Sequence, residues 1–228
     1  MSFFVVAISH VQAQENKLFK IKAGEDIQRS LPFTDKYRYP QFKIGGVAFL
    51  NGGTTPAKLN YSLLLGEMHF ISPAGDTLSL ANETTIKWIQ LGNDYFYYSP
   101  DYGYLEIIHD SPTIKLAIKQ IFRVASVEKI GAYQQSSGVS SIKNYSILST
   151  GNSSVKRLEA KGDVILSKEK FYFFIDQNNR FYKATKSNLL KIFVKNKRII
   201  ENYLKEESID FTNEENLKKL LQYCSQFS

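Results

Sequence analysis

Between residues 42 and 127 the sequence alternates apolar and polar side chains in short runs. Two-residue alternation is typical of β-strands with one buried face, because successive side chains point to opposite sides of the sheet. Turn signals separate the runs at Asn51-Gly52, Pro73 to Asp76, Gly92-Asn93 and Pro100-Asp101. Links this short cannot carry the crossover that parallel strands need, so we expect an antiparallel meander.

The pattern predicts strands at residues 42–50, 59–63, 67–71, 77–80, 85–91, 94–98, 104–109 and 114–124, and again at 163–166 and 170–175. Between these two groups, residues 134–154 contain eight serines, two glycines and few apolar residues. Such a composition buries too little apolar surface to order a chain, and it predicts a mobile, Ser-rich surface loop.

From Lys186 onward the apolar residues recur at helical spacing. Thr212 and Glu215 fit a capping box in which the Thr212 side chain accepts a hydrogen bond from the backbone N–H of Glu215. We therefore expect two short helices in residues 184–228 that pack on the sheet. The predicted fold is mainly β (α+β): an antiparallel β-meander or partly closed barrel over residues 14–183, with a C-terminal α-helical pair.

The first thirteen residues look like a secretory signal. An apolar run from Phe3 to Ile8 precedes Val11-Gln12-Ala13, which offers small residues before a cleavage point after Ala13. The positively charged start of a signal is missing, and the alternative is a buried first strand. We expect residues 1–13 to be removed and the chain to be exported.

Four stretches are similar to an uncharacterised family of exported proteins from Bacteroidetes-type bacteria. They are YRYPQFKIGGVAFLNG, LNYSLLLGEMHFI, GAYQQSSGVSSI and KSNLLKIFVKNKRIIENYLKEESIDFTNEENLKKLLQYC. The similarity covers most of the chain after residue 36, and its most specific part is the ending. It implies a periplasmic, outer-membrane-associated or secreted location, and it implies no activity or catalytic residue.

The charge of the chain is unevenly spread. Residues 44–110 hold two Lys and seven Asp or Glu, whereas residues 111–183 hold twelve Lys or Arg and five acids. Export argues against nucleic acid as the partner of the basic part, and an envelope protein or an anionic glycan fits it better. Cys224 is the single cysteine, so the chain has no internal disulfide and no cysteine metal cluster.

Six aromatic rings lie between Tyr95 and Tyr104. Alternation predicts that Phe96 and Tyr98 join the core, while the other face carries Tyr95 and Tyr97 and is extended by Tyr102 and Tyr104. Three basic side chains share one face of the next strand: Lys115, Lys119 and Arg123. We predict these seven residues as the candidate ligand-binding set; the alternatives are ordinary packing of the rings and a solvated face for the cations.

Candidate catalytic groups are few. Glu106 is the one acid of the middle region placed in mid-strand, and it is the candidate catalytic carboxylate; Asp76, Asp94, Asp101 and Asp110 adjoin turn residues. His69 and His109 lie on different predicted strands without metal-ligand spacing, so we predict no metal site. Nucleotide, nucleophile-elbow and CxxC signatures are absent, and we predict no cofactor.

Two classes of function follow from these observations. The first is a non-enzymatic envelope protein that binds a protein partner or an anionic glycan through an aromatic and basic sheet face. The second is a hydrolase that cleaves an envelope polymer with Glu106 and a second carboxylate. A purely structural envelope component is compatible with the same sequence.

Overall fold

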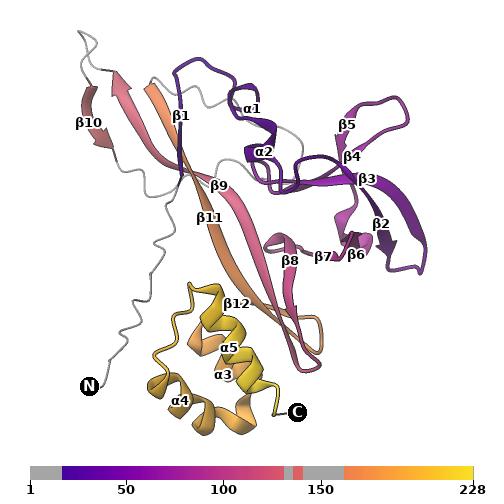
Figure 1. The fold of residues 1–228 in the computed structure, drawn as a ribbon, viewed down its shortest axis with the longest axis vertical. Helices are drawn as coiled ribbons and strands as arrows, with labels where there is room; N and C mark the ends of the chain where they lie inside the picture. The colour runs from indigo at the N-terminus through magenta and orange to yellow at the C-terminus, as the bar shows by residue number, and fades with distance from the viewer. Residues whose placement is uncertain (1–16, 131–135, 141–161, 228) are drawn as a thin grey trace, which may run out of the picture.

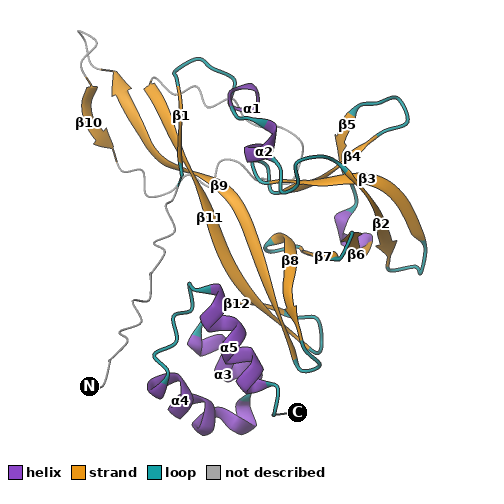
Figure 2. Ribbon diagram, viewed as in Figure 1, coloured by secondary structure: helices purple, strands orange, loops and turns teal. Residues whose placement is uncertain are grey.

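The computed structural model describes residues 17–130, 136–140 and 162–227, which form a twisted antiparallel sheet with helices against it (Figures 1 and 2). The strands are β1 (Leu18–Ile21), β2 (Lys43–Phe49), β3 (Thr54–Ser62), β4 (Glu67–Ile71), β5 (Thr77–Ser79), β6 (Ile86–Leu91), β7 (Asp94–Ser99), β8 (Gly103–Asp110), β9 (Ile114–Ile130), β10 (Ser136–Ser140), β11 (Gly162–Asp176) and β12 (Phe181–Lys183). The helices are α1 (Ile27–Ser30), α2 (Phe33–Lys36), α3 (Lys186–Ile192), α4 (Lys197–Glu206) and α5 (Glu214–Cys224), with the 3-10 helices η1 (Glu83–Thr85) and η2 (Val194–Asn196).

The order of strands in the sheet is β1-β11-β9-β8-β7-β6-β2-β3-β4-β5, with β10 beside β9 and β12 beside β11. From β2 to β9 most neighbours in the sheet are also neighbours in the chain, as a meander requires. The prediction of a mainly antiparallel β fold with C-terminal helices is confirmed. The sheet is open, because β1 and β5 are the ends of this order.

A long ribbon of β9 and β11 carries two cores on one face. The ribbon pairs Ile114 with Asp176 at one end and Lys129 with Gly162 at the other. In Figure 1 it runs past the curled strands β2–β5 and the helices α3–α5. Ile118 belongs to the core under the helices, whereas Phe122, four residues further along the same face of β9, belongs to the core that is lined by strands β2, β3 and β4.

The curled part of the sheet folds back onto the ribbon. Strand β8 pairs with only the first part of β9, and further along β9 the backbone N–H of Phe122 donates to the carbonyl oxygen of Leu63, 2.9 Å away. Residue Tyr37 bridges to Ser62 at the end of β3, so the segment before β2 also lies against this turn. These contacts place residues 36–39 against the face of strands β3 and β4 that carries the buried core.

The helices cover the lower part of the same face of the ribbon (Figure 2). Leu189, Ile200, Leu217 and Leu220 are fully buried in one cluster with Ile114, Leu116 and Phe174 of the ribbon. Burial of apolar area stabilises a fold by about 25 cal/mol per Å², and short helices depend on this packing because they are not stable alone. The first predicted helix is divided at Phe193 into α3 and α4 by the turn η2.

Three details of the prediction need correction. Residues 136–140 of the predicted mobile loop form strand β10, which extends the hairpin edge of β9, while residues 134, 135 and 141–154 lie outside the described residues. The two predicted strands at 163–166 and 170–175 are one strand, β11. Helix α5 is capped by Asn213, which accepts from the N–H of Asn216, because the Thr212 hydroxyl donates to Asp210 instead.

Candidate functional site

The two faces of the central strands separate the rings of residues 95–98 as the alternation predicts. We call the face that carries Phe96 and Phe122 the inner face and the opposite one the outer face. Phe96 is 1% exposed in the inner core, and Tyr98 packs against that core. Tyr95 and Tyr97 lie on the outer face, where Tyr97 is registered with Leu105 of β8.

Three partly exposed rings, Trp88, Tyr95 and Tyr97, form what we call the aromatic strip of the outer face. The rings of Trp88 and Tyr95 meet edge to face, with centroids 5.7 Å apart and planes at 71°. Tyr95 is 37% exposed, and Trp88 and Tyr97 are intermediate. The backbone under these rings is fixed by pairing of β6 with β7 and of β7 with β8. The strip therefore presents ring surface on a preformed support.

The structure does not bring Tyr102 and Tyr104 into the strip together. Tyr104 is registered with Tyr98 and lies in the inner core at 3% exposure, so its prediction as an outer-face residue is wrong. Burial raises the pKa of its phenol, whose oxygen has no hydrogen-bond partner in the described structure. Tyr102 lies in the turn before β8 and packs on Phe173 of the outer face, with ring centroids 4.8 Å apart.

The three basic side chains Lys115, Lys119 and Arg123, which we call the basic row, do lie on the outer face, but each of them already has a partner on the protein. Lys115 pairs with Asp110, and Arg123 lies 3.5 Å from Glu169 while covering the ring of Phe171. Lys119 donates to the carbonyl oxygen of Tyr102 at 2.7 Å, and burial, with a smaller effect of Arg123, lowers its pKa. The row thus supports the aromatic surface more than it offers free charge.

Glu106 is buried in an ion pair on the inner face. Arg38 Nε donates to Glu106 Oε2 at 2.8 Å and Arg38 Nη2 donates to Glu106 Oε1 at 2.9 Å. The Glu106 side chain is 6% exposed and that of Arg38 is 35% exposed. The hydrogen bond to Glu106 raises the pKa of Arg38. Both carboxylate oxygens are held by one guanidinium, an arrangement suited to anchoring a chain segment.

The same segment is anchored by two further contacts that sequence reasoning missed. Tyr39 donates its phenol proton to Asp94 Oδ2 at 2.6 Å, and Asn60 exchanges hydrogen bonds of 3.2 and 2.9 Å with the backbone of Tyr39. Asp94, expected as a turn former, is thus also a side-chain acceptor. A detectable signal was the isolated acid Glu106 among apolar strand residues, since a buried carboxylate needs a cation.

Neither His69 nor His109, the two histidines of the described residues, belongs to a group of side chains that could hold a metal ion. His69 Nδ1 lies 3.0 Å from Tyr37 Oη, and its Nε2 lies 3.6 Å from Glu67. His109 lies beyond a register shift after Ile107, where the regular alternation that the sequence analysis assumed for β8 ends. In the described ranges, no group of three His, Cys, Asp or Glu side chains could hold a metal ion.

Comparisons with protein-family models, with curated proteins and with solved structures find no match to this chain. The similarity to exported Bacteroidetes-type proteins therefore stays a prediction, and so does export. Residues 1–13, the predicted signal, lie outside the described residues. Among the helices of residues 17–130, 136–140 and 162–227, none is long and apolar enough to cross a membrane.

Proposed function

We propose that this protein is a non-enzymatic, exported cell-envelope protein that binds a glycan through the aromatic strip of its outer face. The observation that carries the proposal is the Trp88–Tyr95 pair. Two partly exposed rings supported by a paired sheet, with their planes at 71°, give a sugar an angled apolar surface on which it can stack against the face of one ring and touch the other. Tyr and Trp also keep polar atoms that hydrogen-bond sugar hydroxyls at the ring edges.

Stacking is expected to contribute more than charge. Lys115, Lys119 and Arg123 each have a partner on the protein itself, so an anionic glycan would gain little from displacing them. The proposal therefore no longer requires the ligand to be anionic. A protein partner remains the other occupant of the strip, and the experiment below separates the two.

The hydrolase alternative loses its motivation at Glu106. Glycoside hydrolysis uses two carboxyl groups that face the scissile bond from opposite sides. Glu106 instead faces Arg38, and the nearby carboxylate Asp94 accepts the phenol proton of Tyr39. Both acids hold the segment of residues 36–39 in place.

The test uses the only tryptophan of the chain, Trp88, as a reporter inside the proposed site. Titration with neutral and acidic oligosaccharides should change Trp88 emission in a saturable way. Removal of a stacking ring in Tyr95→Ala should weaken binding about 10-fold, a typical loss for a central aromatic contact. Phe33→Ala is the matched control, because Phe33 is 39% exposed on α2, outside the strip.

Failure of every oligosaccharide to alter the emission would contradict glycan binding. Capture of an envelope protein that is lost in Tyr95→Ala, but not in Phe33→Ala, would assign the strip to a protein partner. Unchanged behaviour of both variants in both assays would leave a structural role for the protein.

A further inference from the structure

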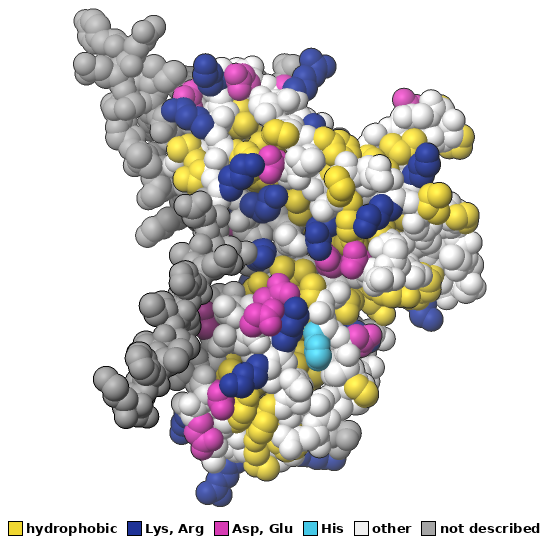
Figure 3. Space-filling view, in the orientation of Figure 1, with side chains coloured by type: hydrophobic (Ala, Val, Ile, Leu, Met, Phe, Trp, Pro, Cys, Tyr) yellow, Lys and Arg dark blue, Asp and Glu magenta, His cyan; other side chains and the backbone are white. Residues whose placement is uncertain are grey.

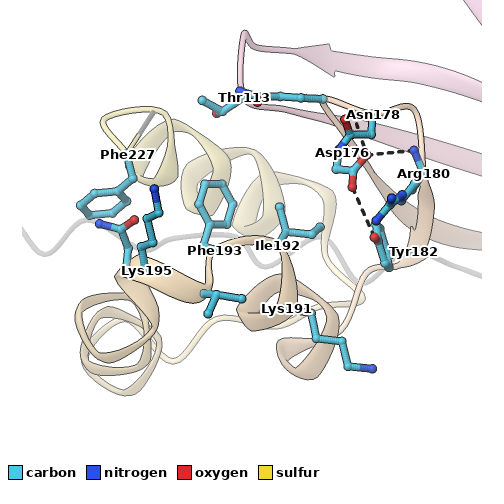
Figure 4. Close-up of a pocket in the computed structure, with 13 residues that line it drawn as sticks. Thr113, Asp176, Asn178, Arg180, Tyr182, Lys191, Ile192, Phe193, Lys195 and Phe227 are labelled. Carbon is cyan, nitrogen blue, oxygen red and sulfur yellow. Dashed lines mark hydrogen bonds between the residues drawn. The ribbon is translucent and has the colours of Figure 1, made fainter.

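A cavity of about 450 Å³ lies between the β11–β12 hairpin and the end of α3. The hairpin turn, the loop before β9, helix α3 with η2, and Phe227 contribute its walls. In Figure 4 the side chains of the hairpin turn stand on one side and those of α3 and η2 on the other. The cavity is large enough for a small organic molecule.

The cations of this cavity, unlike those of the outer face, have no side-chain partner among the described residues. Arg180, Lys191 and Lys195 line it, and none of them forms an ion pair or a side-chain hydrogen bond with another described residue. Figure 4 shows Arg180 in the hairpin and Lys195 beside Phe227, while Lys191 extends outward. Unpaired cations around a concave site attract anions more strongly than cations scattered over a flat surface.

The one acid among the described lining residues, Asp176, is hydrogen-bonded to the hairpin and leaves a net excess of two positive charges in the lining. Asp176 Oδ1 accepts the backbone N–H groups of Asn178 and Arg180, both at 2.9 Å, and its Oδ2 accepts from the Tyr182 hydroxyl at 3.3 Å. The carboxylate is therefore used to fix the hairpin turn. It has no cation among its partners.

The surrounding sequence has the same bias. Residues 177–200 contain no Asp or Glu and seven basic residues: Arg180, Lys183, Lys186, Lys191, Lys195, Lys197 and Arg198. This number equals the formal net charge of the whole chain, +7. In Figure 3 the Lys and Arg side chains elsewhere on the visible face are dispersed among acids and apolar groups.

The remaining walls are apolar or uncommitted. Tyr182, Ile192, Phe193 and Phe227 supply ring and aliphatic surface. Thr113, 6% exposed, also lines the cavity, and its hydroxyl has no hydrogen-bond partner in the described structure. A buried hydroxyl without a partner is uncommon in folded proteins.

From these observations we propose that the cavity between the β11–β12 hairpin and α3 binds a small organic anion with an apolar ring body. Aromatic carboxylates, sulfonates and phosphate esters share this chemistry. The charged group would lie near Arg180 or Lys195, and the ring against Phe193 and Tyr182. This site is separate from the aromatic strip and does not depend on the function proposed for it.

The probes are 8-anilinonaphthalene-1-sulfonate, an aromatic sulfonate, and N-phenyl-1-naphthylamine, its neutral counterpart. Each is titrated against the full chain by fluorescence. Each close charge contributes roughly two- to five-fold to binding, so Arg180→Gln/Lys195→Gln should weaken sulfonate binding by about four- to 25-fold. The control Lys87→Gln/Lys170→Gln changes the net charge equally at exposed positions outside the cavity. Neither pair should change binding of the neutral probe more than about two-fold.

Equal sulfonate binding by the wild type and Arg180→Gln/Lys195→Gln would overturn the proposal, because the dye would then bind elsewhere. One alternative location is the apolar groove lined by Val47, Phe49 and Phe70. An equal loss in the control pair would show an effect of net charge alone. An equal loss of the neutral probe would show a collapsed cavity, and both results reject the anion site.

Discussion

Replacement of Arg38 by Met should lower the free energy of unfolding by about 3 kcal/mol, because it leaves a buried carboxylate without its cation. Loss of one partner from a buried pair costs ~3–5 kcal/mol. We expect the lower end of that range, since the Arg38 side chain is 35% exposed and water can enter the space it leaves. Met keeps most of the aliphatic stem, so the lost packing is small.

Removal of the acidic partner should lower the free energy of unfolding by less than removal of Arg38. Glu106→Leu leaves a guanidinium that can turn toward water, and we expect a loss of about 1–2 kcal/mol. The double variant Arg38→Met/Glu106→Leu leaves no stranded charge and should lie within ~1 kcal/mol of the wild type. Urea unfolding of the four proteins then gives a coupling energy of roughly 3–6 kcal/mol between the two side chains.

Lys115→Met is the matched control. In the Lys115–Asp110 pair, as in the Arg38–Glu106 pair, a basic side chain contacts an acidic residue of β8. The side chain of Asp110, however, is 61% exposed. Its loss should cost less than ~1 kcal/mol. Burial of Glu106 does not set these costs if Glu106→Leu destabilises the protein as much as Arg38→Met, or if Arg38→Met costs no more than Lys115→Met.

Three further predictions concern other parts of the fold. Gly45→Ala would place Cβ against the carbonyl oxygen of Gln90 in β6 and should cost about 1–3 kcal/mol in urea unfolding; Gly46→Ala, with only an ordinary contact, is its control and should cost clearly less. His69, whose Nε2 lies 3.6 Å from the Glu67 carboxylate, and the Ser79 hydroxyl, which donates to Glu67 Oε2 at 2.6 Å, lower the pKa of Glu67 in the folded protein. Stability should therefore decrease as the pH falls below roughly 4.5 and through the folded pKa; Glu67→Gln should show a smaller acid-side loss, and identical pH curves would contradict this. Burial raises the pKa of Cys224 to about 12, so a thiol reagent should modify it only as fast as the protein opens, and rapid labelling at pH 8 without denaturant would contradict its burial.

The alternation of residues 94–98 was sufficient to predict that Tyr95 and Tyr97 lie on the face opposite to Phe96 and Tyr98, because the pleat repeats every two residues whatever the strand packs against. It was insufficient at Tyr104. The face of a residue across a turn depends on the turn length, and here Ser99 pairs with Gly103, which registers Tyr98 with Tyr104. A turn of three residues between the two strands predicts this pairing. The sequence analysis instead placed Tyr102 and Tyr104 together on the outer face.

The partner of Glu106 was beyond the reach of local patterns. Arg38 precedes it by 68 residues and comes from a segment with no strand signal of its own. Likewise, the cavity beside α3 joins a hairpin turn to a helix end, and only the packing of the helices on the ribbon brings them together. The basic residues around this cavity were not recognised as a cluster, because the charges were counted over residues 111–183. That range includes Arg180 but not Lys191 or Lys195.

Strand β1 adds a constraint of timing. Leu18 pairs with Ser167 and Ile21 with Val164, so nearly three quarters of the chain must emerge before the first strand has its neighbour. Contacts this distant in sequence form slowly, because a long loop must close before they are made. During synthesis the start of the chain is therefore free for longest, which gives any factor that recognises unfolded N-terminal segments a wide interval in which to act.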